Sequence, residues 1–235
     1  MIEGTKLTAG ALDDGAEIET VMLAAGSGQE TGLRSLAEAA MSRGARVFEM
    51  APGVMERVAG TVTPQPVLAV ARMPGTTLEE LASGSFLLVC VEMRDPGNLG
   101  ALIRVADASG ADGVICCGGT ADPYNPKAVR AAAGAVLHLP VVIEGAADAS
   151  LAKLGELGFR RFGTAARGGL GYEDVSWNGR IGLVFGNEGS GLPDVLASCI
   201  DGLVSIPMAG KAESLNVAAA AAVICFEALR QRSRV

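Results

Sequence analysis

The stretch IGLVFGNEGSGLPDVL (181–196) is an apolar strand that runs into a glycine-rich turn and then toward a helix. Two further stretches follow the same plan, DPGNLGALIRVADASGADGVICCGG (95–119) upstream and VSIPMAGKAESLNVAAAAAV (204–223) downstream. Three strand-to-loop junctions of this composition bring backbone and a few polar side chains to one edge of a sheet. Because open α/β sheets bind their ligands at such edges, we expect these stretches to decide the function.

The composition indicates a protein of the reducing cytoplasm. Its 235 residues suffice for one large domain, or for a small domain followed by a medium one. No apolar run reaches the roughly 18 residues of a membrane span, and the first residues lack the pattern of a signal peptide. The five cysteines form no CxxC pair and are odd in number, so we expect buried thiols and no disulfide framework.

The charge balance by itself argues against a nucleic-acid partner. The net charge is −7, whereas proteins that hold nucleic acid usually carry a basic surface. The acidity is concentrated at the front of the chain, because residues 1–80 carry six basic and eleven acidic side chains.

The order of apolar and polar segments predicts an α/β organisation in two parts. Residues 1–72 are predicted to form a compact α/β unit, 73–85 a linker, and 86–235 a larger domain of alternating strands and helices. Near-continuous apolar strands covered by helices predict a mostly parallel sheet that is buried on both faces. The strands are expected at 18–24, 46–50, 66–73, 86–92, 113–119, 136–142, 160–166, 181–186 and 203–208. The helices are expected at 32–44, 98–109, 126–133, 147–157, 190–198 and 214–231.

Several kinds of catalytic machinery are missing from the sequence. The one histidine, His138, lies in the apolar stretch VLHLP and is expected to be structural. The sequence lacks the G-x-S-x-G elbow, the dinucleotide fingerprint and the P-loop. It also has no cluster of metal-ligating residues, so we expect no metal. An enzyme with this sequence must bind its reagent largely through backbone groups.

Each of the three stretches has a structural and a functional interpretation. Asn98 is predicted to cap the helix that follows it, and Arg104 to project from that helix toward the loop. Glu188 is the only charge between Arg180 and Asp194, which favours a polar site or a loop contact. Ser214 and Asn216 suit the start of a long helix. Turns, caps and a solvated arginine would explain each stretch taken alone.

Together the stretches resemble the SpoU (TrmH-type) RNA ribose 2′-O-methyltransferases of the SPOUT class. The resemblance rests on DPGNLGALIRVADASGA, VFGNEGSGL and IPMAGKAESLNVA, with DPYNPKAVRAAAGAVLHLPV (122–141) between them. It covers roughly residues 86–231. The first part of the chain, with EGTKLTAGAL and TVTPQPVLAVAR, is similar to the ribosomal-protein-like substrate-binding domain of that family.

The resemblance implies a catalytic domain with a deep C-terminal trefoil knot, S-adenosylmethionine held in the knotted loops, and a homodimer that builds the active site at its interface. It implies ribosomal or transfer RNA as the substrate. The implied cofactor contacts are Thr164, Gly186, Ile206 and Leu215. The implied catalytic and substrate-orienting residues are Asn98, Arg104, Glu188, Ser214 and Asn216.

The proposed chemistry is attack of a ribose 2′-hydroxyl on the sulfonium methyl group. The pKa of arginine lies above about 12, so we expect Arg104 to orient the hydroxyl and the adjacent phosphate, and we leave the proton acceptor open. One alternative is a catalytically silent factor that binds the cofactor and RNA. A second alternative is methylation of a base. The acidic first part departs from what an RNA-binding domain requires, unless RNA is held by local basic side chains or by the catalytic domain.

Overall fold

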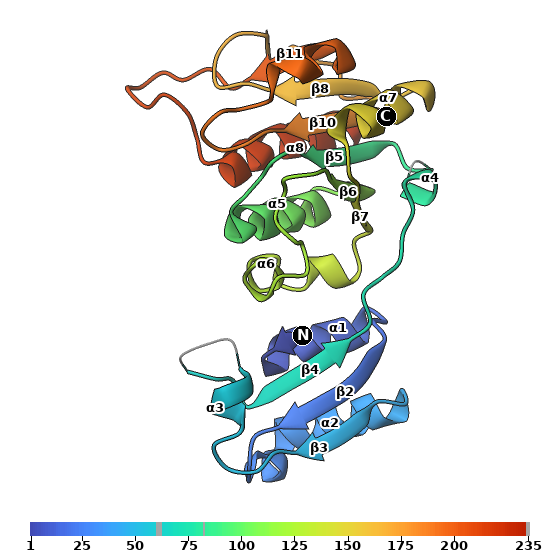
Figure 1. Ribbon diagram of the computed structural model, residues 1–235, viewed down its shortest axis with the longest axis vertical. Helices are drawn as coiled ribbons and strands as arrows, with labels where there is room; N and C mark the ends of the chain where they lie inside the picture. Colours follow the sequence, from blue (N-terminus) through green and yellow to red (C-terminus); the bar gives the residue numbers. More distant parts are fainter. Residues whose placement is uncertain (60–62, 82, 234–235) are drawn as a thin grey trace. The chain divides into compact units, whose positions relative to one another are not determined.

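The protein is described by a computed structural model that covers residues 1–59, 63–81 and 83–233. Parts of three predicted segments lie outside the described residues, namely 60–62 of the first domain, 82 of the linker and 234–235 at the end. Contacts divide the chain into two compact units (Figure 1). The first consists of Met1–Pro74 with Ala133–His138, and the second of Gly75–Ala132 with Leu139–Val235.

The first unit is a four-stranded mixed sheet with the strand order β1-β4-β2-β3. Its alternate residues Val21, Val67 and Ala69 enter a core with the apolar side chains of α1 and α2. The strand and helix predictions for 18–24 and 32–44 are confirmed, whereas β1 and α1 were not predicted. The elements are β1 (Ile2–Glu3), α1 (Thr5–Asp13), β2 (Ile18–Leu23), the 3-10 helix η1 (Ser27–Gln29), α2 (Thr31–Ser42), β3 (Arg46–Glu49), α3 (Met55–Val58) and β4 (Val67–Ala71).

The second unit is built on a seven-stranded sheet with the order β7-β6-β5-β10-β8-β11-β9. Every pairing among its described strands is parallel, which confirms the predicted parallel sheet. Its strands are β5 (Phe86–Cys90), β6 (Gly113–Cys116), β7 (Val141–Ile143), β8 (Arg160–Thr164), β9 (Leu170–Gly171), β10 (Ile181–Phe185) and β11 (Gly202–Ser205). Its helices are α4 (Leu78–Leu81), α5 (Pro96–Ala108), α6 (Pro126–Ala131), α7 (Ala147–Glu156), the 3-10 helix η3 (Asp194–Cys199) and α8 (Val217–Arg232).

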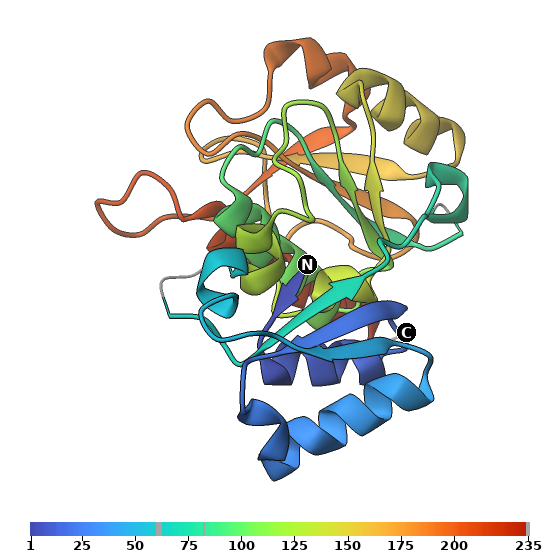
Figure 2. The same ribbon diagram turned by 60° about the horizontal axis from the view of Figure 1, so that its bottom comes forward.

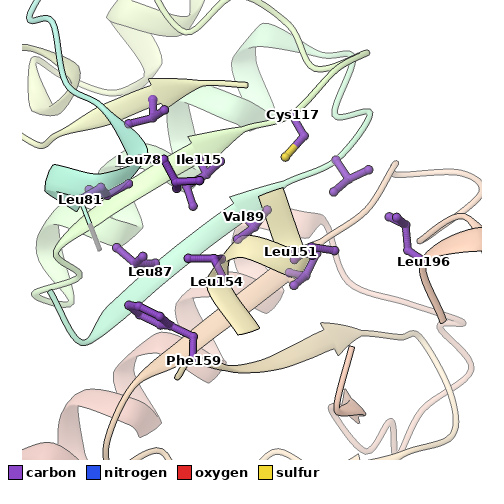
Figure 3. Close-up of a cluster of buried hydrophobic side chains, with 13 residues drawn as sticks. Leu78, Leu81, Leu87, Val89, Ile115, Cys117, Leu151, Leu154, Phe159 and Leu196 are labelled. Carbon is purple, nitrogen blue, oxygen red and sulfur yellow. The ribbon is translucent and has the colours of Figure 1, made fainter. Parts of the chain in front are cut away.

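Helices cover both faces of this sheet. Figure 3 shows the core on one face, where Leu87 and Val89 of β5 meet Leu151 and Leu154 of α7. Phe86 points to the opposite face, because successive strand residues alternate, and the guanidinium of Arg232 on α8 lies 5.4 Å from its ring centroid. All five residues of β5 are buried, as are all five of β10. A sheet covered in this way accounts for the continuous apolar strands of the sequence.

Three predicted elements differ from the structure. The strand expected over 136–142 is wrong, since the 3-10 helix η2 (Ala135–Leu137) comes first and β7 begins only after Pro140. The helix expected over 190–198 is wrong at its start, because Gly191 has a φ of 71° and the 3-10 helix begins after Pro193. The stretch expected as a linker contains α4, whose Leu78 and Leu81 are buried in the core of the second unit.

His138 is therefore not a strand residue. It follows η2, and its side chain is one-third exposed. Its Nδ1 lies 3.0 Å from a carboxylate oxygen of Asp14, so the pair is ionic when the imidazole is protonated. His138 does not line the cavity described below, which is consistent with the structural role expected for it.

Candidate active site

A cavity of about 820 Å³ lies at the carboxyl ends of β8, β10 and β11. The segments that follow these three strands form its wall, and Asn98 joins them from α5. The long connection between β11 and α8 extends away from the rest of the sheet in both views (Figures 1 and 2), and several of its residues also line the cavity. Eight of the residues named from the sequence lie here: Asn98, Thr164, Gly186, Glu188, Ile206, Ser214, Leu215 and Asn216.

A chain of hydrogen bonds joins the three sequence motifs at this cavity. The side-chain nitrogen of Asn98 donates to a carboxylate oxygen of Glu188 over 3.1 Å. The amide nitrogen of Asn216 donates to the Asn98 side-chain oxygen over 2.9 Å, and the backbone N–H of Ala218 donates to Asn216 over 2.9 Å. Each of these three hydrogen bonds is donated in the direction of Glu188. The start of α8 thus fixes two amides and, through them, one carboxylate.

Asn98 has a different role from the helix cap predicted for it. The cap of α5 is Asp95, whose side chain accepts from the backbone N–H of Asn98 over 2.9 Å. The amino group of Lys127 lies 2.7 Å from the other Asp95 oxygen. These hydrogen bonds, the one from Lys127 first, hold the pKa of the Asp95 carboxyl below its ordinary value. Because Asp95 caps the helix, the Asn98 side chain is left to reach Glu188 and Asn216.

Asn216 is the cap of α8, as predicted, but the helix starts at Val217 and not at 214. Ser214 and Leu215 therefore precede the helix and belong to the loop. Both are exposed and line the cavity.

The glycine at the end of β10 gives the cavity its close backbone wall. A Cβ at Gly186 would lie 2.4 Å from the backbone of Gly191, so a side chain at this position would displace the loop. The hydroxyl of Thr164 donates to the carbonyl of Val184 over 3.1 Å and holds the ends of β8 and β10 together. Leu192 and Ile206 add apolar surface to the wall.

Arg104 is the one predicted site residue that does not line this cavity. It lies on α5 and is exposed. Among the described residues it has no hydrogen-bond or ion-pair partner. Within one chain, the Arg104 guanidinium therefore does not join the other eight predicted site residues at the cavity.

Sequence reasoning missed several residues of the cavity. Arg167 and Glu213 contribute a positive and a negative charge besides Glu188. No pattern in the sequence distinguishes Arg167 from other arginines in loops. Asn187 was also missed, although its place between Gly186 and Glu188 was a usable signal.

The second unit matches a family model described as "SpoU rRNA Methylase family" over residues 85–226, and the first matches one described as "MRM3-like substrate binding domain" over 1–69. Because the first of these models spans more than half of the chain, the protein belongs to the SpoU rRNA methylase family. The resemblance derived from the three motifs is thereby confirmed.

Individual relatives agree with this assignment. The chain is 37% identical to the 23S rRNA (guanosine(2553)-2′-O)-methyltransferase RlmP of Bacillus subtilis, over 79% of this chain and 73% of the relative. It is 33% identical to the 23S rRNA (guanosine-2′-O-)-methyltransferase RlmB of Xanthomonas campestris, over 98% and 96%. The SpoU methyltransferase AviRb of Streptomyces viridochromogenes, solved in complex with the cofactor AdoMet, superposes with a TM-score of 0.85 at 31% identity, over 99% and 89%.

Proposed function

We propose that this protein transfers a methyl group from S-adenosylmethionine to a ribose 2′-hydroxyl of 23S ribosomal RNA. The observation that carries the proposal is that the three motif loops meet at one cavity, where Glu188, Asn98 and Asn216 are joined by hydrogen bonds. Two relatives that align over 98% of this chain are named as 23S rRNA (guanosine-2′-O-)-methyltransferases. This favours ribosomal RNA over transfer RNA as the substrate.

The residues of the cavity fit the cofactor. Gly186 allows a ligand to approach the backbone closely, and Leu192 and Ile206 offer apolar surface to a purine ring. Glu188 and Glu213 give the lining more negative than positive charge, which complements a sulfonium and an ammonium group, while Arg167 can pair with a carboxylate. Thr164, Gly186, Ile206 and Leu215 are the proposed cofactor contacts.

The side chains of the site supply alignment. The bound cofactor provides a methyl group on a positively charged sulfur, a strong electrophile, so catalysis needs orientation more than an acid or a base. Asn98, Glu188 and Asn216 hold the loops and the ribose in place through their hydrogen-bond chain. The Ser214 hydroxyl lies in the same lining and can contact the ribose. Arg104 orients the 2′-hydroxyl and the neighbouring phosphate.

Arg104 acts on the cavity of a second copy of the chain, and the enzyme is a homodimer. Two observations support this: Arg104 is exposed and absent from the cavity of its own chain, and α8, which packs on α5, carries Phe226 with 47% of its surface exposed. Aromatic side chains are enriched at protein interfaces relative to the rest of the surface. In the dimer, the arginine of one chain completes the amide and carboxylate set of the other.

The other parts of the proposal follow from the family. The first domain, residues 1–72, binds the RNA, the catalytic domain spans 86–235, and its last segment is threaded as a trefoil knot. The insertion of β10 between β5 and β8, with α8 packed on α5, supports such threading. No helix in the described part of the chain is long and apolar enough to cross a membrane. The protein is proposed to act in the cytoplasm.

The test is a methyl-transfer assay with tritiated S-adenosylmethionine and rRNA that lacks the modification. Nucleoside analysis should find a 2′-O-methylated nucleoside, and the modified site should resist alkaline cleavage. Arg104→Ala should lower turnover by about 100-fold and leave cofactor affinity, measured by calorimetry, unchanged. Lys153→Ala removes a cation of α7, outside both the cavity and residues 1–72, and is the control.

Each alternative has its own outcome in this assay. A methylated base would establish the base-methylation alternative. Binding of both cofactor and RNA without any transfer would establish the silent-factor alternative. Near-normal turnover by Arg104→Ala would contradict the role assigned to the arginine.

A further inference from the structure

The side chain of Asn187, in the candidate site, makes hydrogen bonds through both its oxygen and its nitrogen. Its oxygen accepts from the backbone N–H groups of Gly189 and Ser190, over 2.9 and 3.2 Å, and from the Ser190 hydroxyl over 3.2 Å. Its backbone exchanges two further hydrogen bonds with Gly191, over 3.0 and 2.9 Å. One residue therefore closes the loop 187–191 on itself.

The other end of the same side chain leaves the loop. The amide nitrogen of Asn187 donates to the carbonyl oxygen of Glu92 over 3.0 Å. Glu92 follows β5 directly and leads into the turn that carries Asn98. A half-buried side chain thus joins the glycine-rich loop to the start of the first motif by a hydrogen bond.

The residue at the far end of this bond has an unusual backbone. Glu92 has a φ of 52°, in the left-handed region, and within the described chain only Ala133 shares this among residues other than glycine. Such a conformation is unfavourable for a residue with a side chain and persists where the surroundings fix it. The bond from Asn187 is a contact that fixes it, because it sets the direction of the Glu92 carbonyl.

We propose that Asn187 is a positioning residue for methyl transfer: it clamps the cofactor loop to the end of β5 and so sets Glu188 within hydrogen-bond distance of Asn98. This inference rests on the proposed function. Asn187 acts through its neighbours, since Glu188 is the next residue along and the Glu188–Asn98 bond crosses the same junction. Both functions of the clamp require an amide, because a carboxylate accepts but cannot donate.

The substitution Asn187→Asp separates the two functions. It keeps an acceptor for Gly189 and Ser190, so the loop still closes, but it places an anion against the Glu92 carbonyl in place of a donor. We expect turnover to fall about tenfold and the cofactor dissociation constant to rise about tenfold, as for a lost hydrogen bond that leaves an acceptor unpaired. Asn178→Asp is the matched control, since Asn178 is exposed and outside the cavity.

A second substitution tests whether the bond holds the backbone of Glu92. Glycine adopts a positive φ without cost, so Glu92→Gly should make the turn less dependent on the clamp. In the Asn187→Asp background, Glu92→Gly should recover most of the lost turnover and affinity. Glu92→Ala removes the same carboxylate, keeps the backbone cost and should recover neither.

The outcomes test the role of Asn187 as a clamp separately from the proposed function. Wild-type levels of turnover and affinity in Asn187→Asp would overturn the clamp, and so would equal effects of glycine and alanine at position 92. If the wild-type protein transfers no methyl group, the proposed function fails. Cofactor affinity and the hydrogen-exchange protection of the Gly189 and Ser190 amides would still test the clamp in that case.

Discussion

Arg161 and Asp201 form an ion pair of the second unit that is joined by several hydrogen bonds. Two guanidinium nitrogens of Arg161 donate to the two carboxylate oxygens, over 3.0 and 2.8 Å, and its backbone N–H donates to the same carboxylate over 2.7 Å. The pair fixes the start of β8 to the residue that precedes β11. Because Thr164 and Ile206 lie at the other ends of these strands, it supports one wall of the cavity.

The pair predicts a pH dependence of stability. The hydrogen bond from the Arg161 side chain lowers the pKa of Asp201 below its ordinary value of 3.8. A carboxyl whose pKa is lower in the folded state contributes stability above about pH 4 and loses it as the pH falls through the lowered pKa. Asp201→Asn should cost about 1 kcal/mol at pH 7, since the carboxylate is partly exposed to solvent.

Urea unfolding at pH 7 and at pH 3 checks this prediction. The difference between the wild type and Asp201→Asn should shrink at pH 3, whereas the exposed Asp194→Asn control should differ little from the wild type at either pH. A difference that stays constant between the two pH values would rule out the ion pair as its cause.

The sequence predicted which residue types form the site, but it predicted less well which side chains contact each other. Glu188 stood out as an isolated charge in an apolar and glycine-rich stretch, and its hydrogen bond to Asn98 agrees with that interpretation. The cap of α5 was misassigned because Asp95 and Asn98 are both good capping residues. Only the backbone geometry of the turn decides which of the two accepts from the helix.

At the scale of elements, α5 and α6 approach unusually closely at one glycine. A Cβ at Gly100 would lie 2.2 Å from the carbonyl oxygen of Ala128 and 2.7 Å from the Cβ of Ala131. The contact places α6, with Lys127 at its first turn, beside the capping residue Asp95. The small side chains of both helices therefore have a packing role at the edge of the site.

Gly100→Ala should destabilise the second unit although alanine favours helices. The expected loss is about 1–3 kcal/mol from overpacking. Gly10→Ala in α1, where no atom lies within 4 Å of the added carbon, should instead raise the stability of the first unit by roughly 0.5–1 kcal/mol. Chemical denaturation of both variants checks the pair. A stability of Gly100→Ala equal to that of the wild type would contradict the close approach.

The predicted boundaries of helices and strands were wrong where proline and glycine interrupt apolar stretches. Residues 136–142 are apolar enough for a strand, yet the backbone turns through Gly134 and a 3-10 helix before β7 forms. Long apolar strands such as β5 and β10 were predicted closely, because burial on both faces requires a continuous apolar sequence. Short elements such as β1 and β9 carry too few residues to show a period.

At the scale of the whole molecule, the proposed dimer predicts complementation between two impaired variants. Arg104→Ala lacks the guanidinium, and Gly186→Ala blocks the cofactor wall, so each should have little activity alone. A mixed dimer has one site in which an intact cavity faces an intact Arg104, and it should recover part of the activity, up to about a quarter of the wild-type value per chain if exchange is random.

Mixing the two variants and measuring methyl transfer checks this arrangement. Light scattering of the wild type should give a dimer, and the mixture should contain one as well. Failure of the mixture to exceed either variant alone, with exchange of chains shown by mass, would place Arg104 outside the site of the second copy.

The sequence by itself determined the parallel α/β sheet, the three loops at its edge and the residue types of the site. These depend on local apolar patterns and on motifs that the chain carries in order. Tertiary structure alone decided that Asn98 reaches Glu188 and Asn216, that Gly186 has no room for a side chain, and that Arg104 lies outside its own cavity. The two Asn98 contacts join residues 90 and 118 positions apart, which local preferences do not encode. The lack of room at Gly186 depends on the path by which the loop returns to Gly191.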